Sequence, residues 1–515
     1  MLWPFLLCLL WATAPTAWAQ FGMTKTTGAD YGAPPTVTSV SGKLDAVLDF
    51  DYHTYSGPSD TVKTRAMNGS IPGPTFVFSA GDTVRILFRN KMTGPNPAGV
   101  MNEYRTPETT NLHTHGLHVS SLSPQDNVKL EILPGEEYQY EYQIPKDHLP
   151  GTHWYHPHHH GSTALHVGGG AFGVLIVQDP AGTLPAEVEA MGMGQVLCFS
   201  HMGTRALTEI ASTSGDTWFS VTGATQDIVL LNGLTKPKLT MQPGEWQRWR
   251  MVFAGVDEAL NIVLNSCELQ LLAKDGVYLT SLPRTVTTIQ LPPGGRADVA
   301  VRCPTAGTYT LSSTNRDITH DLATISVTGT AVASSPLATF KYPMPAYLTD
   351  LLNTAANATF ALNINGGGGC SVNNVAFTSM TNYLSCMELG TVQEWSFQGQ
   401  NAHPIHIHVN PYQITSIAAD EYHQVGDWHD TLLTSAGGQV TVRFRTADFP
   451  GPVVIHCHIL AHEDRGCMGL AYIYNGSNAN DTCVVSAALP LLAPRSVPFW
   501  AALVAVVVTI ASGSR

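Results

Sequence analysis

The chain has 515 residues with 26 basic and 39 acidic side chains, a formal net charge of −13. This length predicts about three domains, a hydrophobic content of 44% excludes wholesale disorder, and the lack of a basic stripe argues against nucleic acid as a partner. Charged residues make up only 13%, while 46 glycines and 33 prolines indicate many turns and favour a β-rich chain over a helical bundle.

Residues 1–19 are predicted to be a secretory signal peptide. An apolar run extends from Leu2 to Trp11, and Ala17-Trp18-Ala19 fits a cleavage site between small residues. The alternative for this segment is a buried N-terminal strand. Four N-x-S/T sequons also indicate export, because such sites accept oligosaccharides on secreted proteins. The sequon asparagines are Asn68, Asn357, Asn475 and Asn480.

Several stretches alternate apolar and polar residues with a period of two, as half-buried strands do. The clearest are residues 84–89, 138–144 and 440–445. Long segments with a helical period of 3.6 are scarce. The pattern therefore predicts an all-β protein built from antiparallel sandwiches or barrels.

One layout recurs three times along the chain. Each copy has a glycine before an opening strand and a later glycine before a closing strand, and the closing strand carries His-x-His in the first and third copies but Ser312-Ser313-Thr314 in the second. We therefore expect three related domains at 20–185, 186–335 and 336–480, with metal ligands only in the outer two. The opening glycines are Gly81, Gly244 and Gly390, and the closing ones are Gly151, Gly307 and Gly451.

Four His-x-His pairs stand out among the 21 histidines. Residues i and i+2 of a strand point to the same face, so each pair can aim two imidazoles at one place. Imidazole suits copper, zinc, iron and nickel. One such pair is readily a coincidence, but four at repeat-equivalent positions predict a cluster of several metal ions between the first and third domains. The pairs are His113 and His115, His156 and His158, His406 and His408, and His456 and His458.

Cys457 lies between His456 and His458. Strand alternation sends its sulfur to the opposite face, where it can bind a second metal centre while its neighbours bind the cluster. His403 and His462 are placed to complete that centre, and two histidines with a cysteine are the ligands of blue-copper electron-transfer sites. Since the thiolate is the ligand, we expect Cys457 to be free rather than part of a disulfide.

The remaining cysteines are expected to pair in an oxidising compartment. Cys8 lies in the predicted signal peptide, which leaves an odd number besides Cys457, so at least one should be unpaired. These cysteines are Cys198, Cys267, Cys303, Cys370, Cys386, Cys467 and Cys483.

The tail, residues 481–515, ends in an apolar segment at 499–511. This segment is shorter than the roughly 20 residues needed to span a bilayer. It fits the end of a GPI-attachment signal, with Ser486, Ala487 and Ala488 as the small residues upstream. The tail predicts a cell-surface protein anchored to the membrane through a C-terminal lipid, with free secretion and a short tail anchor as alternatives.

Four runs resemble the copper motifs of the multicopper oxidases, the laccase-type group: HTHG (113–116), WYHPH (154–158), HPIHIH (403–408) and HCHILAHEDRGCM (456–468). The resemblance spans roughly residues 35–475 and includes LNGLTKPKLTMQPGEWQRWR (231–250) in the middle repeat. It implies three tandem cupredoxin-like domains, each a Greek-key β-sandwich or barrel, and four copper ions per chain.

The resemblance also implies which residue binds each copper ion. The type 1 copper takes His403, Cys457 and His462; the type 2 copper takes His113 and His406; one type 3 copper takes His115, His156 and His458; the other takes His158, His408 and His456.

The activity so implied is oxidation of phenols or aromatic amines, one electron at a time, at the type 1 copper. Substrate would deliver electrons through the ring edge of His462 or His403, and Cys457 would pass them to His456 and His458. Dioxygen would then be reduced to water by four electrons.

Two other functions remain open. A ferroxidase or other metal-ion oxidase would need carboxylates beside the type 1 histidines, and the third domain offers Asp420, Glu421, Asp427 and Asp430. A non-catalytic surface protein on a cupredoxin scaffold would have lost copper ligands, whereas the outer domains retain the full set.

Oxygen reduction also needs carboxylates to deliver protons. Asp126, eleven residues after His115, and Glu463, next to His462, resemble the acids that do so in the family. The alternative for each is a solvated surface acid.

One position departs from the family pattern. The fifth residue after His462 is usually Met, Leu or Phe, and here it is Cys467, followed by Met468. The axial residue tunes the potential of a blue-copper site. Our hypothesis is that Cys467 occupies this position without strong bonding; the alternatives are a disulfide at Cys467 and a shift that brings in Met468.

Overall fold

The computed structural model describes residues 27–224, 226–315, 319–365, 370–399, 403–433, 438–478 and 483–485. The predicted signal peptide, Asn480 and the predicted lipid-attachment segment lie outside these ranges. Within them, no helix is both long and apolar enough to cross a membrane.

The first repeat forms two five-stranded sheets that face each other across a core containing Phe88, Tyr140 and Leu175. In the order of their pairing, one sheet holds β1 (Thr36–Thr38), β4 (Thr75–Phe78), β9 (Gly173–Val177), β8 (Gly151–His156) and β6 (His113–His115). The other holds β11 (Ser220–Thr222), β3 (Thr61–Met67), β2 (Lys43–Ser56), β5 (Thr83–Asn90) and β7 (Glu137–Gln143).

The second repeat forms a seven-stranded and a five-stranded sheet around Trp249, Leu271 and Val299. The larger sheet holds β12 (Ile228–Leu231), β10 (Gln195–Met202), β14 (Trp246–Ala254), β20 (Arg296–Arg302), β16 (Glu268–Lys274) and β17 (Val277–Tyr278), with β18 (Arg284–Val286) also beside β16. The smaller holds β13 (Lys238–Met241), β22 (Thr319–Val327), β21 (Gly307–Thr314), β15 (Leu260–Val263) and β19 (Ile289–Leu291).

The third repeat packs a six-stranded sheet on a five-stranded one around Trp395, Ile414 and Ile455. The first holds β24 (Ser371–Val372), β23 (Ala358–Asn365), β26 (Val392–Gly399), β31 (Val440–Arg445), β28 (Tyr412–Ser416) and β29 (Trp428–His429). The second holds β25 (Tyr383–Glu388), β33 (Met468–Tyr474), β32 (Gly451–Cys457), β27 (Pro404–Ile407) and β30 (Thr431–Leu433).

The strands predicted from alternation are confirmed as β5, β7 and β31, because their apolar residues alternate into the cores. The closing strands β8, β21 and β32 begin at Gly151, Gly307 and Gly451, as the repeat predicts. The prediction of purely antiparallel sheets is wrong in one respect. Each sheet also contains at least one parallel pair, such as β2 with β5 and β23 with β26. A period of two shows which face is buried but not the direction of the neighbouring strand.

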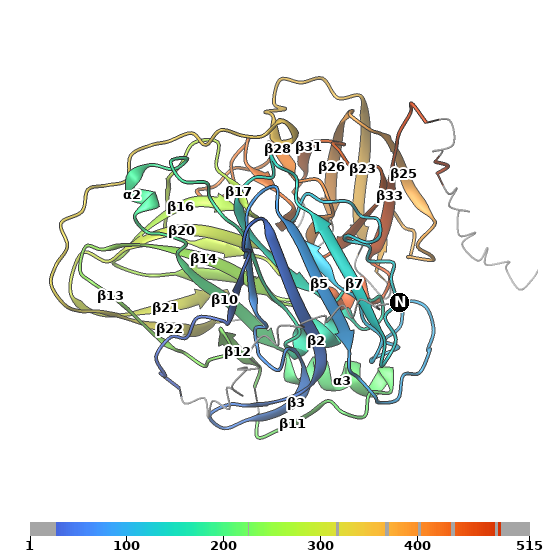
Figure 1. Cartoon of the computed structure of the whole chain (residues 1–515), viewed down its shortest axis with the longest axis horizontal. Coiled ribbons are helices and arrows are strands. Elements are labelled where there is room, and N and C mark those ends of the chain that lie inside the picture. The colour runs from blue at the N-terminus through green and yellow to red at the C-terminus, as the bar shows by residue number, and fades with distance from the viewer. Residues whose placement is uncertain are drawn as a thin grey trace, which may run out of the picture.

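Figure 1 shows the three groups of strands in turn: blue to cyan in the centre, green to yellow on the left, and orange to red at the upper right. The helices of the described ranges are short: α1 (Thr163–Gly169), α2 (Ala186–Glu189), α3 (Thr204–Ser214), α4 (Leu460–Glu463) and a 3₁₀ turn (Ala346–Leu348). Asp464, just after α4, accepts hydrogen bonds from the backbone N–H groups of Gly161, Thr163 and Ala164 at the start of α1. This contact fixes α4 of the third repeat against the first.

Candidate metal centres

Strand register brings the histidine pairs together. In the first repeat β6 pairs with β8 so that His113 lies opposite His156, and in the third β27 pairs with β32 so that His406 lies opposite His456. The second member of each pair lies two residues further along the chain. The rings then meet across the boundary between the two repeats: the ring centroids of His113 and His408 are 3.9 Å apart, and those of His115 and His406 are 3.8 Å apart.

All four His-x-His pairs are buried, and their rings gather in one place as expected, whereas the metal ions that they would bind stay a prediction. Buried polar atoms normally have hydrogen-bond partners, yet six of these eight histidines have a ring nitrogen that lacks one in the described part of the chain and that a metal ion can occupy. These nitrogens are His113 Nε2, His115 Nδ1, His156 Nε2, His406 Nε2, His408 Nε2 and both nitrogens of His458. The Nε2 atoms of His158 and His456 face each other at 3.3 Å.

Electrostatics favour neutral rings in this cluster. Burial, followed by the neighbouring ring of His406, lowers the pKa of His115 well below its usual range. Burial, followed by His113, does the same to the pKa of His408. Since neutral imidazole is the form that binds metals, the donor set fits several copper ions.

Within the described residues, three groups of ring nitrogens in the cluster lie within 4.8 Å of one another. One contains His158, His408 and His456, the complete ligand set implied for one type 3 copper. The others are His113 with His406 and His408, which includes the implied type 2 pair, and His113 with His115 and His156. His458 is in none of these groups, but its ring centroid is 5.0 Å from that of His115 and 5.6 Å from that of His156.

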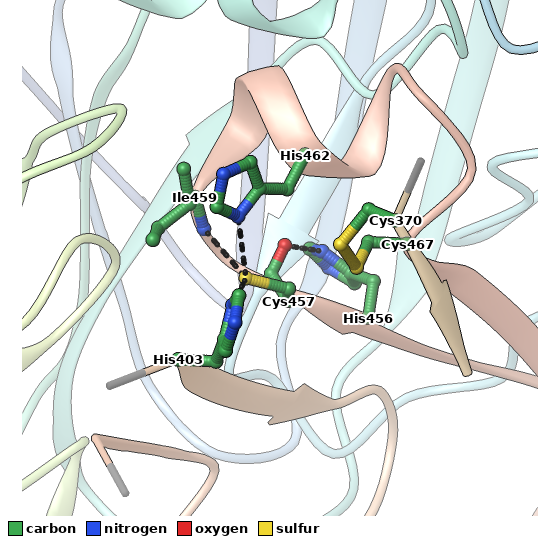
Figure 2. The surroundings of a disulfide bond; sticks show 7 residues. All are labelled: Cys370, His403, His456, Cys457, Ile459, His462 and Cys467. Atoms are coloured by element: carbon green, nitrogen blue, oxygen red, sulfur yellow. Dashed lines mark hydrogen bonds between the residues drawn. A yellow bond between two sulfur atoms is a disulfide. The ribbon is translucent and has the colours of Figure 1, made fainter. Parts of the chain in front are cut away.

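The second centre forms around Cys457 (Figure 2). Its Sγ lies 3.1 Å from His403 Nδ1 and 3.8 Å from His462 Nδ1, and it accepts a hydrogen bond from the backbone N–H of Ile459. Burial raises the pKa of the Cys457 thiol, so a bound cation is needed to hold it as thiolate. Cys457 is free, as predicted.

The hypothesis that Cys467 is a free axial residue is wrong, because Cys467 forms a disulfide with Cys370. Figure 2 shows the Cys457 sulfur pointing toward the two histidines, with this disulfide on the other side. The other disulfides join Cys267 to Cys303 and Cys386 to Cys483. The cysteine left over from the odd count is Cys198, which is buried and free.

Asp126 and Glu463 are buried beside the cluster, so neither is a solvated surface acid. Asp126 Oδ2 accepts a hydrogen bond from His113 Nδ1 at 2.8 Å. Burial alone would raise the pKa of Asp126, but His113 outweighs it and the pKa is lowered. Glu463 lies between two rings, with Oε1 3.3 Å from His158 Nδ1 and Oε2 3.3 Å from His456 Nδ1. Burial, followed by the charge of Asp464, raises the pKa of Glu463 well above its usual range.

The carboxylates suggested for a metal-ion oxidase have other contacts. Asp420 accepts from the backbone of His423, Glu421 accepts from Thr287, Asp427 pairs with Lys274 and Arg284, and Asp430 pairs with Arg296 beside the cluster. One acid near the Cys457 centre is a residue that sequence reasoning missed. Burial, followed by the charges of His403 and Arg465, lowers the pKa of His462 to about 4, and the charge of Asp257 partly opposes this shift.

Asp257 comes from the middle repeat, in the loop after β14. Its neighbour Val256 accepts a hydrogen bond from the backbone N–H of Leu460, which holds this loop against α4. The middle repeat also supplies Arg296 and Gly294 near the cluster. No motif marks these three residues, so only the three-dimensional structure reveals them.

The chain is similar in sequence to known multicopper oxidases. Three family models described as multicopper oxidase match residues 50–182, 199–335 and 343–477. The chain is 25% identical over 417 residues to the multicopper oxidase mco of Staphylococcus haemolyticus (strain JCSC1435), covering 80% of this chain and 84% of that protein. It is 23% identical over 527 residues to laccase-1 of Botryotinia fuckeliana, covering 92% of this chain and 87% of that one.

The structure superposes on a multicopper oxidase from Campylobacter jejuni, described as a metallo-oxidase, with a TM-score of 0.69 and 21% identity, covering 87% of this chain and 96% of that structure. This likeness shows the same fold of tandem cupredoxin-like domains. Because the three family matches together cover more than half of the residues, the chain belongs to the multicopper oxidase family.

Proposed function

We propose that the protein is an extracellular multicopper oxidase that takes single electrons from phenols or aromatic amines and reduces dioxygen to water. The observation that carries this proposal is the position of Cys457, whose sulfur faces His403 and His462 while its chain neighbours His456 and His458 belong to the buried histidine cluster. Copper ions bound at both centres, four per chain, would supply the one-electron chemistry.

The ligand sets implied by the family are part of this proposal, and the unpartnered buried ring nitrogens support them. The type 1 centre takes His403, Cys457 and His462, and the type 2 centre takes His113 and His406. The two type 3 centres take His115, His156 and His458, and His158, His408 and His456.

Electrons are expected to enter at His462. His403 and Cys457 are almost fully buried, whereas His462 is partly exposed. From the Cys457 sulfur, a few covalent bonds of the chain lead to His456 on one side and His458 on the other.

Asp257 favours a phenol or an aromatic amine as substrate. Both lose a proton more readily as they are oxidised, and a carboxylate beside the electron-accepting ring can take that proton. The Asp257 side chain is 37% exposed, so a substrate can reach it.

A metal-ion oxidase is the second candidate, because two carboxylates, Asp227 and Asp257, flank His201 in this region. A substrate cation bound between these carboxylates would compete with the positive charge of His201. Burial opposes a charged His201, but the hydrogen bonds that its ring donates to Asp227 and Asp257 outweigh burial and raise the pKa of His201 to about 9. The imidazolium neutralises part of the acidic charge, which favours the organic substrate.

Asp126 and Glu463 are proposed to serve proton delivery to the cluster, supported by their burial and their contacts with His113, His158 and His456. Domain limits at 20–185, 186–335 and 336–480 are also proposed, since all strands except β11 pair within these ranges. Secretion, glycosylation and anchoring through a C-terminal lipid complete the proposal.

The test is turnover of a phenol and of ferrous iron by the copper-loaded protein. We expect faster oxidation of the phenol, and a fall of about tenfold or more in kcat/KM for the phenol in Asp257→Asn. Asp227→Asn is the matched control, because Asp227 also contacts His201 but is not among the main groups that shift the pKa of His462. Preferential oxidation of iron would support the second candidate, and fully loaded protein that oxidises neither would refute both.

A further inference from the structure

The middle repeat contributes none of the implied copper ligands, yet one of its side chains reaches the cluster. Arg296, at the start of β20, forms two hydrogen bonds to the Asp430 carboxylate, one of them 2.7 Å from Nη1 to Oδ1. The Arg296 and Asp430 side chains are 0% and 3% exposed. Arg296 is itself held by Asp275: its Nη2 donates to the backbone carbonyl of Asp275, and its backbone N–H donates to Asp275 Oδ1.

Asp430 contacts two cluster histidines through two different groups. Its carboxylate Oδ1 lies 3.2 Å from His115 Nε2, and its backbone carbonyl lies 2.8 Å from His406 Nδ1. The Thr431 hydroxyl donates to Asp430 Oδ1 and lies 3.0 Å from His115 Nε2 and 3.2 Å from His406 Nδ1.

These contacts determine which ring nitrogens carry hydrogen. A carboxylate and a carbonyl only accept, so His115 must donate from Nε2 and His406 from Nδ1. The nitrogens left without hydrogen are Nδ1 of His115 and Nε2 of His406. Both are among the buried atoms that have no partner in the described residues.

We propose that Asp430, held by Arg296 of the middle repeat, is a positioning residue that selects the ring nitrogens His115 and His406 present to the copper cluster. His115 donates from Nε2 to the Asp430 carboxylate and so presents Nδ1, whereas His406 donates from Nδ1 to the Asp430 backbone carbonyl and so presents Nε2. The inference rests on the proposed function only in that these rings bind copper.

The backbone of the first repeat packs closely against the pair. Gly116, directly after His115, has φ +90°, and a Cβ there would lie 2.3 Å from Arg296 Nη2 and 2.8 Å from Asp430 Oδ2. The loop that follows the HTH motif therefore passes directly against the Arg296–Asp430 pair.

The simpler alternative is that the pair only holds two repeats together. Arg250 offers a matched control for that role. It is also a buried arginine of the middle repeat, and it joins Asp298 to Thr152 and Asp179 of the first repeat. Within the described residues, none of its hydrogen bonds goes to a cluster histidine.

The experiment compares full-chain, copper-loaded Asp430→Asn, Arg296→Met, Arg296→Lys and Arg250→Met proteins. The readouts are copper retained against a chelator, the electron paramagnetic resonance signal of type 2 copper, and the blue absorption of the type 1 centre. We expect copper retention in the cluster to weaken about 10–100-fold in Asp430→Asn and Arg296→Met, with an altered type 2 signal and unchanged blue absorption. Arg296→Lys should recover part of the loss, and Arg250→Met should lower only the Tm.

Asp430→Asn preserves side-chain size, so it tests the inference even if Arg296→Met fails to fold. The inference is overturned if Asp430→Asn keeps wild-type copper retention and the wild-type type 2 signal. It is also overturned if Arg250→Met changes that signal as much as Arg296→Met does. Wild-type protein that binds no copper would refute the proposed function, a failure distinct from both of these.

Discussion

At the scale of single residues, the chemistry of the Cys457 centre depends on a thiol whose burial opposes ionisation. The two histidine nitrogens nearest its sulfur belong to rings whose pKa values are also lowered by burial. All three ligands therefore favour their neutral forms in the absence of a cation. A copper ion bound there, as proposed, would stabilise the thiolate, so metal binding and thiol ionisation would be coupled.

Replacing Cys457 with serine is expected to remove the blue absorption and phenol turnover while leaving copper in the histidine cluster, because the other ligands are untouched. Optical spectra together with copper analysis will check this. Cys198→Ser is the control, since Cys198 is the other free cysteine and is equally buried. Loss of colour in the Cys198 variant, or its retention in the Cys457 variant, would contradict the assignment.

Protonation of His201 predicts how the free energy of unfolding depends on pH. Its pKa is raised from 6.5 to about 9, so the protonated ring stabilises the fold fully below about pH 6.5, and this contribution is lost as the pH rises through about 9. We expect His201→Asn to lower the free energy of unfolding by about 2 kcal/mol at pH 6 and by much less at pH 10. Denaturant unfolding across this range measures it; a difference that is constant or grows with pH would be the opposite result.

At the scale of elements, the turn between β19 and β20 lies directly against the His458 ring of the cluster. Gly294 has φ +82°, and a Cβ there would lie 2.8 Å from Nε2 of His458. The second repeat thus limits the space around a ring of the third repeat. β20 lies between β14 and β16 in its sheet, and the turn before it reaches His458.

Gly294→Ala is expected to reduce copper bound in the cluster, because the added methyl group pushes the His458 ring. Gly135→Ala is a close control: Gly135 also has φ +82°, but a Cβ there meets nothing within 4 Å. Both variants should lose about 1 kcal/mol of stability from backbone strain. Equal copper content in the two variants would show that the ring has room to move.

At the scale of the whole molecule, buried charges connect the second and third repeats. Asp427 of the third repeat pairs with Lys274 and Arg284 of the second, at 2.6 Å and 2.7 Å. Lys274 and Asp427 are each 1% exposed. Loss of one partner would leave buried positive charge uncompensated.

Asp427→Asn is therefore expected to lower the free energy of unfolding by about 3–5 kcal/mol. Thermal and denaturant unfolding measure the effect. Asp45→Asn is the control, because the Asp45–Arg85 pair is about half exposed and its loss should change stability little. A similar loss in both variants would mean that burial is not the cause.

Contacts between residues far apart in the chain separate what the sequence could predict from what it could not. Local patterns were sufficient for β5, β7 and β31, for the shared face of each histidine pair, and for the opposite direction of the Cys457 sulfur. The disulfide of Cys370 with Cys467 and the contact of Arg296 with Asp430 join residues 97 and 134 positions apart. The disulfide lies within the third repeat and the Arg296–Asp430 contact joins two repeats, but both depend on how distant segments pack, which no local periodicity specifies.

Strand β11 has a consequence for how the protein is made. It forms after residue 219, in the sequence of the second repeat, yet it pairs with β3 and completes a sheet of the first. During synthesis, the edge of β3 stays open until this later segment has left the ribosome. A polypeptide stopped at residue 185 would expose that edge to other chains, so the amino-terminal part is expected to aggregate when produced alone.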